Sequence, residues 1–262
     1  MTEEHRVESW IELQDALFAD SWNEELGLFR SDFAYRGRAD ATDDLRTSIV
    51  RLGGDARELE GQLMRNFRKY AAADAVPHDT PWDWLALGQH HGLPTRLLDW
   101  TYSPYVALHF VTQGHGWSDR DGVVWCVDYV RAHELLPKAL RKILGDEGAN
   151  VFTTEMLTEA APRVRELEQL AKDDFALFVE PPSFDARIVN QYALFSLMSH
   201  VDGNLDEWIE AHEGLCRRII VPAGLKWEVR DKLDQANLTE RVLFPGLDGV
   251  SRWLARYYAP RR

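Results

Sequence analysis

One stretch of the sequence concentrates polar and charged residues, which are unfavourable to bury in a core unless they have partners. Within seven positions it carries hydroxyls, a guanidinium and a carboxylate: Thr95, Arg96, Asp99 and Thr101. A helix is expected to end at Gly92, just before this stretch, and another to begin at Ser103 and Pro104 after it. A loop that combines these groups with a helix N-terminus can hold an anionic or polar ligand. A structural interpretation is equally open, in which Arg96 pairs with Asp99 to tie the loop and Ser103 only caps the helix.

Two other places in the sequence show a similar combination of residue types. Tyr35, Arg36 and Gly37 put a cation beside a glycine where a short strand ends. Arg187 and Gln191 lie four residues apart, just before an apolar strand. Each of these signals is weak when taken alone.

Two adjacent histidines precede the polar stretch. On a helix, His90 and His91 point about 100° apart, so they are poorly placed to share one metal ion. His91 stands next to Gly92 at the mouth of the loop. An imidazole titrates near neutral pH, which makes His91 a candidate general base.

No metal is expected in this protein. Cys126 and Cys216 have no CxxC or CxxH spacing, and each lies in an apolar, strand-like run typical of a buried thiol. Asp99, Asp128 and Asp185 are scattered rather than paired. This pattern disfavours a metal-dependent nuclease.

The composition sets the outer limits of the interpretation. The 262 residues are 45% hydrophobic and 28% charged, which is typical of a soluble globular protein. The net charge of -13 disfavours a general polycationic nucleic-acid binder but leaves room for a local basic groove. The acidic N-terminus lacks the apolar region of a signal peptide, and no apolar run is long enough to span a membrane. We therefore expect a cytoplasmic protein with no membrane partner.

The order of predicted elements is mixed. Helices are expected over 6–19 and 55–73, and strands over 33–37, 122–130 and 217–221. Asp248 is expected to cap a last helix, with Leu254 and Tyr257 facing inward. There is no regular strand–helix alternation and no GxGxxG or GxxxxGK[ST] loop, so Rossmann and P-loop folds are disfavoured. The pattern favours an α+β fold.

Taken together, the three polar places resemble the FRG domain family, named for its aromatic-Arg-Gly motif. Here that motif is Tyr35-Arg36-Gly37, and the most specific stretch is 89–101, QHHGLPTRLLDWT in one-letter code. Further similarity lies around Gln191 and over 244–249, so the resemblance runs from about residue 33 to 249. It implies one FRG-type domain over 1–262, with an N-terminal helix (1–28), a family-like core (29–250) and a basic C-terminal end (251–262).

The three-part layout is also similar, more distantly, to that of ADP-ribosyltransferases. This resemblance implies a mixed sheet core with flanking helices and NAD as the substrate. By position, it implies that NAD contacts come from a set of residues in all three places: Tyr35, Arg36, Gly37, Thr95, Arg96, Thr101, Ser103 and Phe195. It places Gln191 in the late catalytic position, and Asp99 and His91 complete the set of catalytic candidates through their own chemistry.

One departure weakens the second resemblance. The transferases commonly place a glutamate two residues after the late Glu or Gln, where this chain has Ala193. Asp99 is then the substitute for stabilising positive charge. The expected function is a toxin or phage-defence transferase that acts on nucleic acid or protein, with a neutralising antitoxin as a further partner. An NAD hydrolase and a non-catalytic nucleotide- or nucleic-acid-binding module remain the alternatives.

Overall fold

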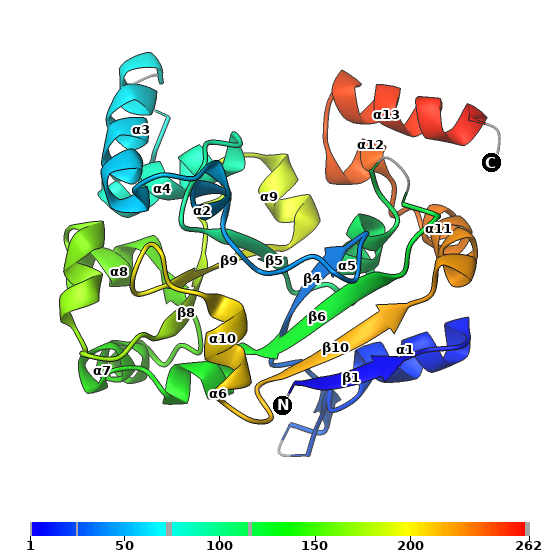
Figure 1. Ribbon diagram of the computed structural model, residues 1–262, viewed down its shortest axis with the longest axis horizontal. Helices are drawn as coiled ribbons and strands as arrows, with labels where there is room; N and C mark the ends of the chain where they lie inside the picture. Colours follow the sequence, from blue (N-terminus) through cyan, green and yellow to red (C-terminus); the bar gives the residue numbers. More distant parts are fainter. Residues whose placement is uncertain (1, 25, 72–74, 115–116, 260–262) are drawn as a thin grey trace.

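An eight-stranded mixed sheet forms the centre of the molecule, and helices flank it (Figure 1). The computed structural model describes residues 2–24, 26–71, 75–114 and 117–259. The sheet order is β1-β10-β6-β4-β5-β9-β8-β7, and β2 and β3 form a separate hairpin. The strands are β1 (Glu3–Arg6), β2 (Trp22–Asn23), β3 (Leu28–Phe29), β4 (Phe33–Arg38), β5 (Leu98–Thr101), β6 (Gly122–Asp128), β7 (Phe152–Thr153), β8 (Ala176–Glu180), β9 (Ala193–Met198) and β10 (Cys216–Val221).

The helices surround the sheet and are mostly short. They are α1 (Trp10–Phe18), α2 (Ser48–Leu52), α3 (Ala56–Tyr70), α4 (Pro81–His90), α5 (Pro104–Val111), α6 (Tyr129–Glu134), α7 (Lys138–Glu147), α8 (Thr154–Ala160), α9 (Ala186–Gln191), α10 (Leu205–Glu210), α11 (Lys226–Gln235), α12 (Glu240–Leu243) and α13 (Leu247–Tyr258), with 3-10 turns η1 (Val164–Gln169) and η2 (Ala223–Leu225). The predicted α+β class is therefore confirmed.

Strand β6 is apolar along nearly its whole length because both of its faces are covered. Val123, Trp125 and Val127 enter one core cluster, which also holds the aromatic side chains of β5 and β8. Val124 and Cys126 point the other way, into the cluster formed with α1, α5 and α11. Successive side chains of a strand alternate between faces, so an uninterrupted apolar run is the expected sequence of a doubly covered strand.

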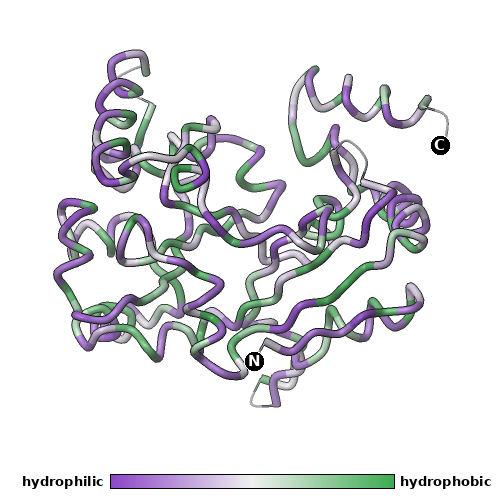
Figure 2. Tube along the Cα trace, in the orientation of Figure 1, coloured by the Kyte–Doolittle hydropathy of each residue, from purple (hydrophilic) through white to green (hydrophobic). Residues whose placement is uncertain are grey.

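The other end of the sheet has its own core. Strands β8 and β9 pack there against α4, α7 and α8, with Leu177, Leu197 and Trp82 buried between them. The outer helices α3 and α13 show alternating hydrophilic and hydrophobic residues along their length, as one-sided helices should (Figure 2).

Helix α5 lies unusually close to β4. A Cβ atom built on Gly37 would come within 1.8 Å of the main-chain oxygen of Ala107. Only glycine allows this contact, so the glycine of the aromatic-Arg-Gly motif sets the distance between strand and helix.

The structure corrects two expectations about local structure. Residues 98–101, expected as loop, form β5 and pair with β9. The last helix is capped by Gly246 rather than Asp248, and Leu254 and Tyr257 are 40% and 60% exposed instead of facing inward. The extreme C-terminus of the expected basic end, residues 260–262, lies outside the described residues.

Candidate functional site

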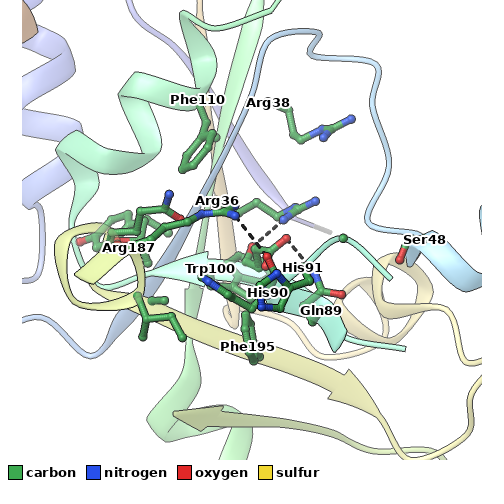
Figure 3. A pocket seen from close by; sticks show the side chains of 18 of the residues that line it. Arg36, Arg38, Ser48, Gln89, His90, His91, Trp100, Phe110, Arg187 and Phe195 are labelled. Atoms are coloured by element: carbon green, nitrogen blue, oxygen red, sulfur yellow. Dashed lines mark hydrogen bonds between the residues drawn. The ribbon is translucent and has the colours of Figure 1, made fainter. Parts of the chain in front are cut away.

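A cavity of about 550 Å³ opens where β4 and β5 diverge. These neighbouring strands share one residue pair in register, Tyr35 with Thr101. We call this cavity the cleft (Figure 3). Its lining comes from β4, α2, the end of α4, β5, α5, α9 and β9: Tyr35, Arg36, Gly37, Arg38, Ser48, Gln89, His90, His91, Gly92, Leu93, Asp99, Trp100, Thr101, Phe110, Arg187, Ile188, Gln191, Ala193 and Phe195.

Arg36 is the central cation of the cleft. Its Nη1 atom donates a hydrogen bond to the main-chain oxygen of Asp99 at 2.5 Å, while its buried Nε atom has no partner among the described residues. Burial lowers the pKa of Arg36 to about 10, although the nearby Asp99 carboxylate acts in the opposite direction. The guanidinium therefore stays charged at neutral pH and retains unused donor capacity, which suits it to an anionic ligand.

Asp99 supplies the negative charge. It is the one carboxylate among the residues that line the cleft in the described part of the chain, and it is exposed. Its Oδ2 atom accepts a hydrogen bond from Gln89 Nε2 at 2.9 Å, and Gln89 Oε1 in turn accepts one from Thr95 Oγ1 at 2.5 Å. This chain of hydrogen bonds fixes the orientation of the carboxylate and leaves its other oxygen available.

Gln191 ends α9 at the opposite side of the cleft. Its Nε2 atom donates a hydrogen bond to the main-chain oxygen of Leu243 at 2.8 Å, so helix α12 determines which way the amide is turned. The main-chain oxygen of Gln191 accepts a hydrogen bond from Thr101 Oγ1 at 2.7 Å. The side-chain carbonyl of Gln191 therefore remains available to accept a hydrogen bond from a ligand. The Thr101 hydroxyl proton is already used in the hydrogen bond that joins β5 to α9.

The two histidines have different surroundings. His90 Nε2 lies 2.8 Å from Asp185 Oδ2, and its side chain is only 7% exposed. His91 is exposed at the rim, with ring contacts to Phe67 and His90. Of the pair, His91 is the one free to meet a ligand.

Of the aromatic side chains near the cleft, Phe110 offers the most accessible face. It comes from α5 and is only partly buried, whereas Tyr35 and Trp100 are almost fully buried. The Tyr35 hydroxyl is hydrogen-bonded to Ser31 and to the main-chain oxygen of Leu17, and Trp100 Nε1 donates to Ser196. Phe195 is also buried in the core, although it contributes to the cleft wall.

Three expected site residues lie outside the cleft lining. Arg96 is 2% exposed and forms two hydrogen bonds of 2.7 Å to the carboxylate of Glu60, so the possible Arg96–Asp99 pair does not form. Thr95 supports Gln89 from behind, and Ser103 caps α5 by accepting a hydrogen bond from the main-chain nitrogen of Val106. Each of the three is held by a structural partner instead: Arg96 by Glu60 of α3, Thr95 by Gln89, and Ser103 by the first turn of α5.

Several lining residues carried no signal of their own in the sequence. Arg38 follows the motif, and its guanidinium is already paired with Asp43, 2.7 Å away. Ser48 accepts a hydrogen bond from the main-chain nitrogen of Thr95. Whether Phe110 faces the cleft depends on how α5 is rotated about its own axis. The close contact between Gly37 and Ala107 sets that rotation, and it cannot be read from the local sequence.

No cluster of three or more His, Cys, Asp or Glu side chains suited to a metal ion occurs in the described part of the chain. Within residues 2–24, 26–71, 75–114 and 117–259, no helix has the length and apolar character needed to cross a membrane.

The fold and the cleft thus define an α+β protein with an arginine-containing cleft at the centre of a mixed sheet. Residues 31–120 match the family model of the FRG domain. The range includes Arg36 and Asp99 and ends before α9, so Gln191 and Arg187 are supplied from outside it. No curated protein and no solved structure matches the chain.

Proposed function

We propose that the cleft binds NAD and that the protein transfers its ADP-ribose group to a macromolecule. The observation that carries this proposal is the meeting of Arg36, Asp99 and Gln191 around one cavity of about 550 Å³. They come from three places far apart in the sequence, on or beside the neighbouring strands β4, β5 and β9. The resemblance to ADP-ribosyltransferases implies this arrangement, and the cavity volume suits a ligand of nucleotide size.

Four side chains of the cleft have a task in this proposal. The bond between nicotinamide and the ribose C1′ breaks, its electron pair leaves with nicotinamide, and the transition state carries positive charge at C1′. The carboxylate of Asp99, held by Gln89, stabilises that charge. Arg36 and Arg187 provide cations for the pyrophosphate. The acceptor attacks C1′ with a lone pair and passes its proton to His91.

Nucleic acid is the acceptor that we propose to test first. An enzyme that modifies nucleic acid or depletes NAD would be toxic in the cell that holds it, which fits the expected toxin or defence role and the need for an antitoxin. The net charge of -13 requires such binding to be local and sensitive to salt.

A second candidate function is a nucleotide-binding module without turnover. One observation favours it: Ala193, at the start of β9, occupies the place where the transferases commonly have a glutamate. The cleft would then bind NAD or a related nucleotide and leave the glycosidic bond intact.

The test is to incubate the purified protein with NAD and to measure released nicotinamide, with water, oligonucleotide or protein as the acceptor. The transferase proposal expects release that depends on Arg36. Binding of NAD without release under every acceptor condition would favour the module, and absence of both release and calorimetric binding would contradict both functions.

A further inference from the structure

A second cavity, of about 670 Å³, adjoins the cleft. It shares His90, His91 and Arg187 with the cleft, so the two cavities are neighbours with part of their lining in common. Its outer wall is the α12–α13 corner, and its lining is completed by Asp185, Ala186, Phe244, Pro245, Gly246, Asp248 and Arg252. None of the functions considered above uses this outer wall.

Two guanidinium groups lie against one aromatic ring in this second cavity. The Cζ atoms of Arg187 and Arg252 are each 5.2 Å from the centre of the Phe244 ring. Neither arginine has a carboxylate partner among the described residues, and the buried Nε atom of Arg187 has no hydrogen-bond partner there either. Unused donors beside an aromatic face are what a phosphate linked to a planar base would meet.

The contrast with Arg256 shows that Arg252 is unusual. Arg256 stands one helical turn further along α13 and makes four hydrogen bonds, two each to Asp234 and Glu240. In a chain with a net charge of -13, carboxylates are plentiful, yet Arg252 is exposed and holds only the Phe244 contact within the described residues.

The remaining charges of the second cavity are compatible with an anion. Asp185 is already engaged, because its carboxylate pairs with His90 and accepts hydrogen bonds from the first main-chain nitrogens of α9. Helix α13 begins beside the arginines at Gly246, which offers no side-chain cap to its first turn. Asp248 is exposed and can accept a hydrogen bond from a sugar hydroxyl or a base amino group.

We propose that this second cavity is a subsite for a nucleoside monophosphate unit. The base stacks against the Phe244–Arg252 pair, and the phosphate lies between Arg187, Arg252 and the first turn of α13. This inference rests on the proposed function in that the adjoining cleft holds NAD. The unit has two possible sources: the adenosine half of the dinucleotide itself, or a nucleotide of a nucleic-acid acceptor.

The test compares four proteins: wild type, Arg252→Glu, Phe244→Leu and the control Arg65→Glu. Arg65 is an exposed residue of α3 that lines neither cavity, so its substitution makes the same change of charge elsewhere. Binding of NAD is measured by calorimetry, and binding of a short single-stranded oligonucleotide by fluorescence anisotropy at low salt. Thermal unfolding of each variant checks that it is folded; Arg252 is exposed, so its variant should unfold like wild type.

We expect Arg252→Glu to weaken at least one probe about tenfold or more, the scale of one lost charge-assisted hydrogen bond. Phe244→Leu should weaken the same probe, and Arg65→Glu should weaken neither. Loss confined to the oligonucleotide identifies the acceptor as the source, and loss confined to NAD identifies the dinucleotide.

The subsite is overturned if wild type binds neither probe, if Arg252→Glu leaves both affinities unchanged, or if Arg65→Glu causes an equal loss. Failure of the proposed transfer is a separate result: it would appear as absence of nicotinamide release while binding that depends on Arg252 persists.

Discussion

The guanidinium of Arg36 donates a hydrogen bond to the main-chain oxygen of Asp99, 2.5 Å away. This bond joins β4 to β5 beside the one residue pair, Tyr35 with Thr101, that the two strands share in register. A side chain therefore spans the place where the sheet opens and where the cleft lies. Arg36 therefore holds the scaffold together while its side chain lines the cleft, and its buried Nε atom has no partner among the described residues.

Replacing Arg36 by alanine should weaken NAD binding by about tenfold to a hundredfold, because it removes one of the two cations proposed to hold the pyrophosphate. Calorimetric titration of both proteins measures the change. Arg36→Lys is the matched control, since it keeps the charge and loses the fork of donors, and it should fall between the two. Equal affinity in all three proteins would remove Arg36 from the binding site.

The substitution Asp99→Asn tests the negative charge of this side chain while nearly preserving its shape. An asparagine can still accept the hydrogen bond from Gln89 Nε2, so the side chain keeps its support while losing its negative charge. If the carboxylate stabilises the transition state, nicotinamide release should drop by about a hundredfold with little change in NAD affinity. A variant that releases nicotinamide as fast as wild type would assign Asp99 a purely structural role.

Arg96 is predicted to support the fold rather than the ligand. Arg96→Met strips the partner from Glu60, whose side chain is only 11% exposed, and should lower the free energy of unfolding by about 3 kcal/mol. The double variant with Glu60→Met should lose less, because it leaves no unpaired buried charge. Urea unfolding measures both. If the double variant is stably folded but binds NAD more weakly than wild type, Arg96 contributes to ligand binding and this prediction is wrong.

Gly37→Ala tests the close approach of α5 to β4. The added methyl would lie 1.8 Å from the oxygen of Ala107, so either helix or strand must move, at a cost of about 2 kcal/mol or more. Gly145→Ala is the control: it lies inside α7 with open space around it and should stabilise the protein by about 0.5 kcal/mol. Comparable unfolding curves for the two variants would contradict the role given to Gly37.

The sequence allowed strong local patterns to be interpreted correctly. The apolar run of β6 and the Ser103-Pro104 start of α5 both have a signal confined to neighbouring residues, and both are confirmed. The short strand β5 was expected as loop because its four residues include Asp99 and a threonine, and its pairing with β9 is a long-range contact. Tertiary pairing overrides such weak propensity.

The same limit applies to the cleft. Arg36 and Gln191 could be singled out by type and spacing, and the structure places both in the lining. The partner of Arg96 could not be foreseen, because Glu60 lies 36 residues earlier in the chain, in helix α3. The role of Phe110 likewise depends on how α5 is rotated against Gly37.

Two buried histidines should make stability depend on pH. His133 Nε2 accepts a hydrogen bond from the main-chain nitrogen of Phe178, and His133 Nδ1 donates one to the main-chain oxygen of Asn150, both at 2.8 Å. A second proton on the ring would face the nitrogen donor. Burial, opposed only weakly by the Asn150 contact, lowers the pKa of His133 to about 4. For His109, burial and then the charge of Arg230 lower the pKa to about 3.

The sign follows from which state takes up protons. Below pH 6.5, the ordinary pKa of histidine, the unfolded chain binds a proton at each residue while the folded protein does not. The free energy of unfolding should therefore fall as the pH drops from about 6.5 to 4, by about 1.4 kcal/mol per pH unit for each histidine. Urea unfolding across this window measures the slope. His133→Gln can keep both hydrogen bonds but does not titrate, so it should reduce the slope by the contribution of one histidine. An unchanged slope would show that His133 is protonated in the folded protein.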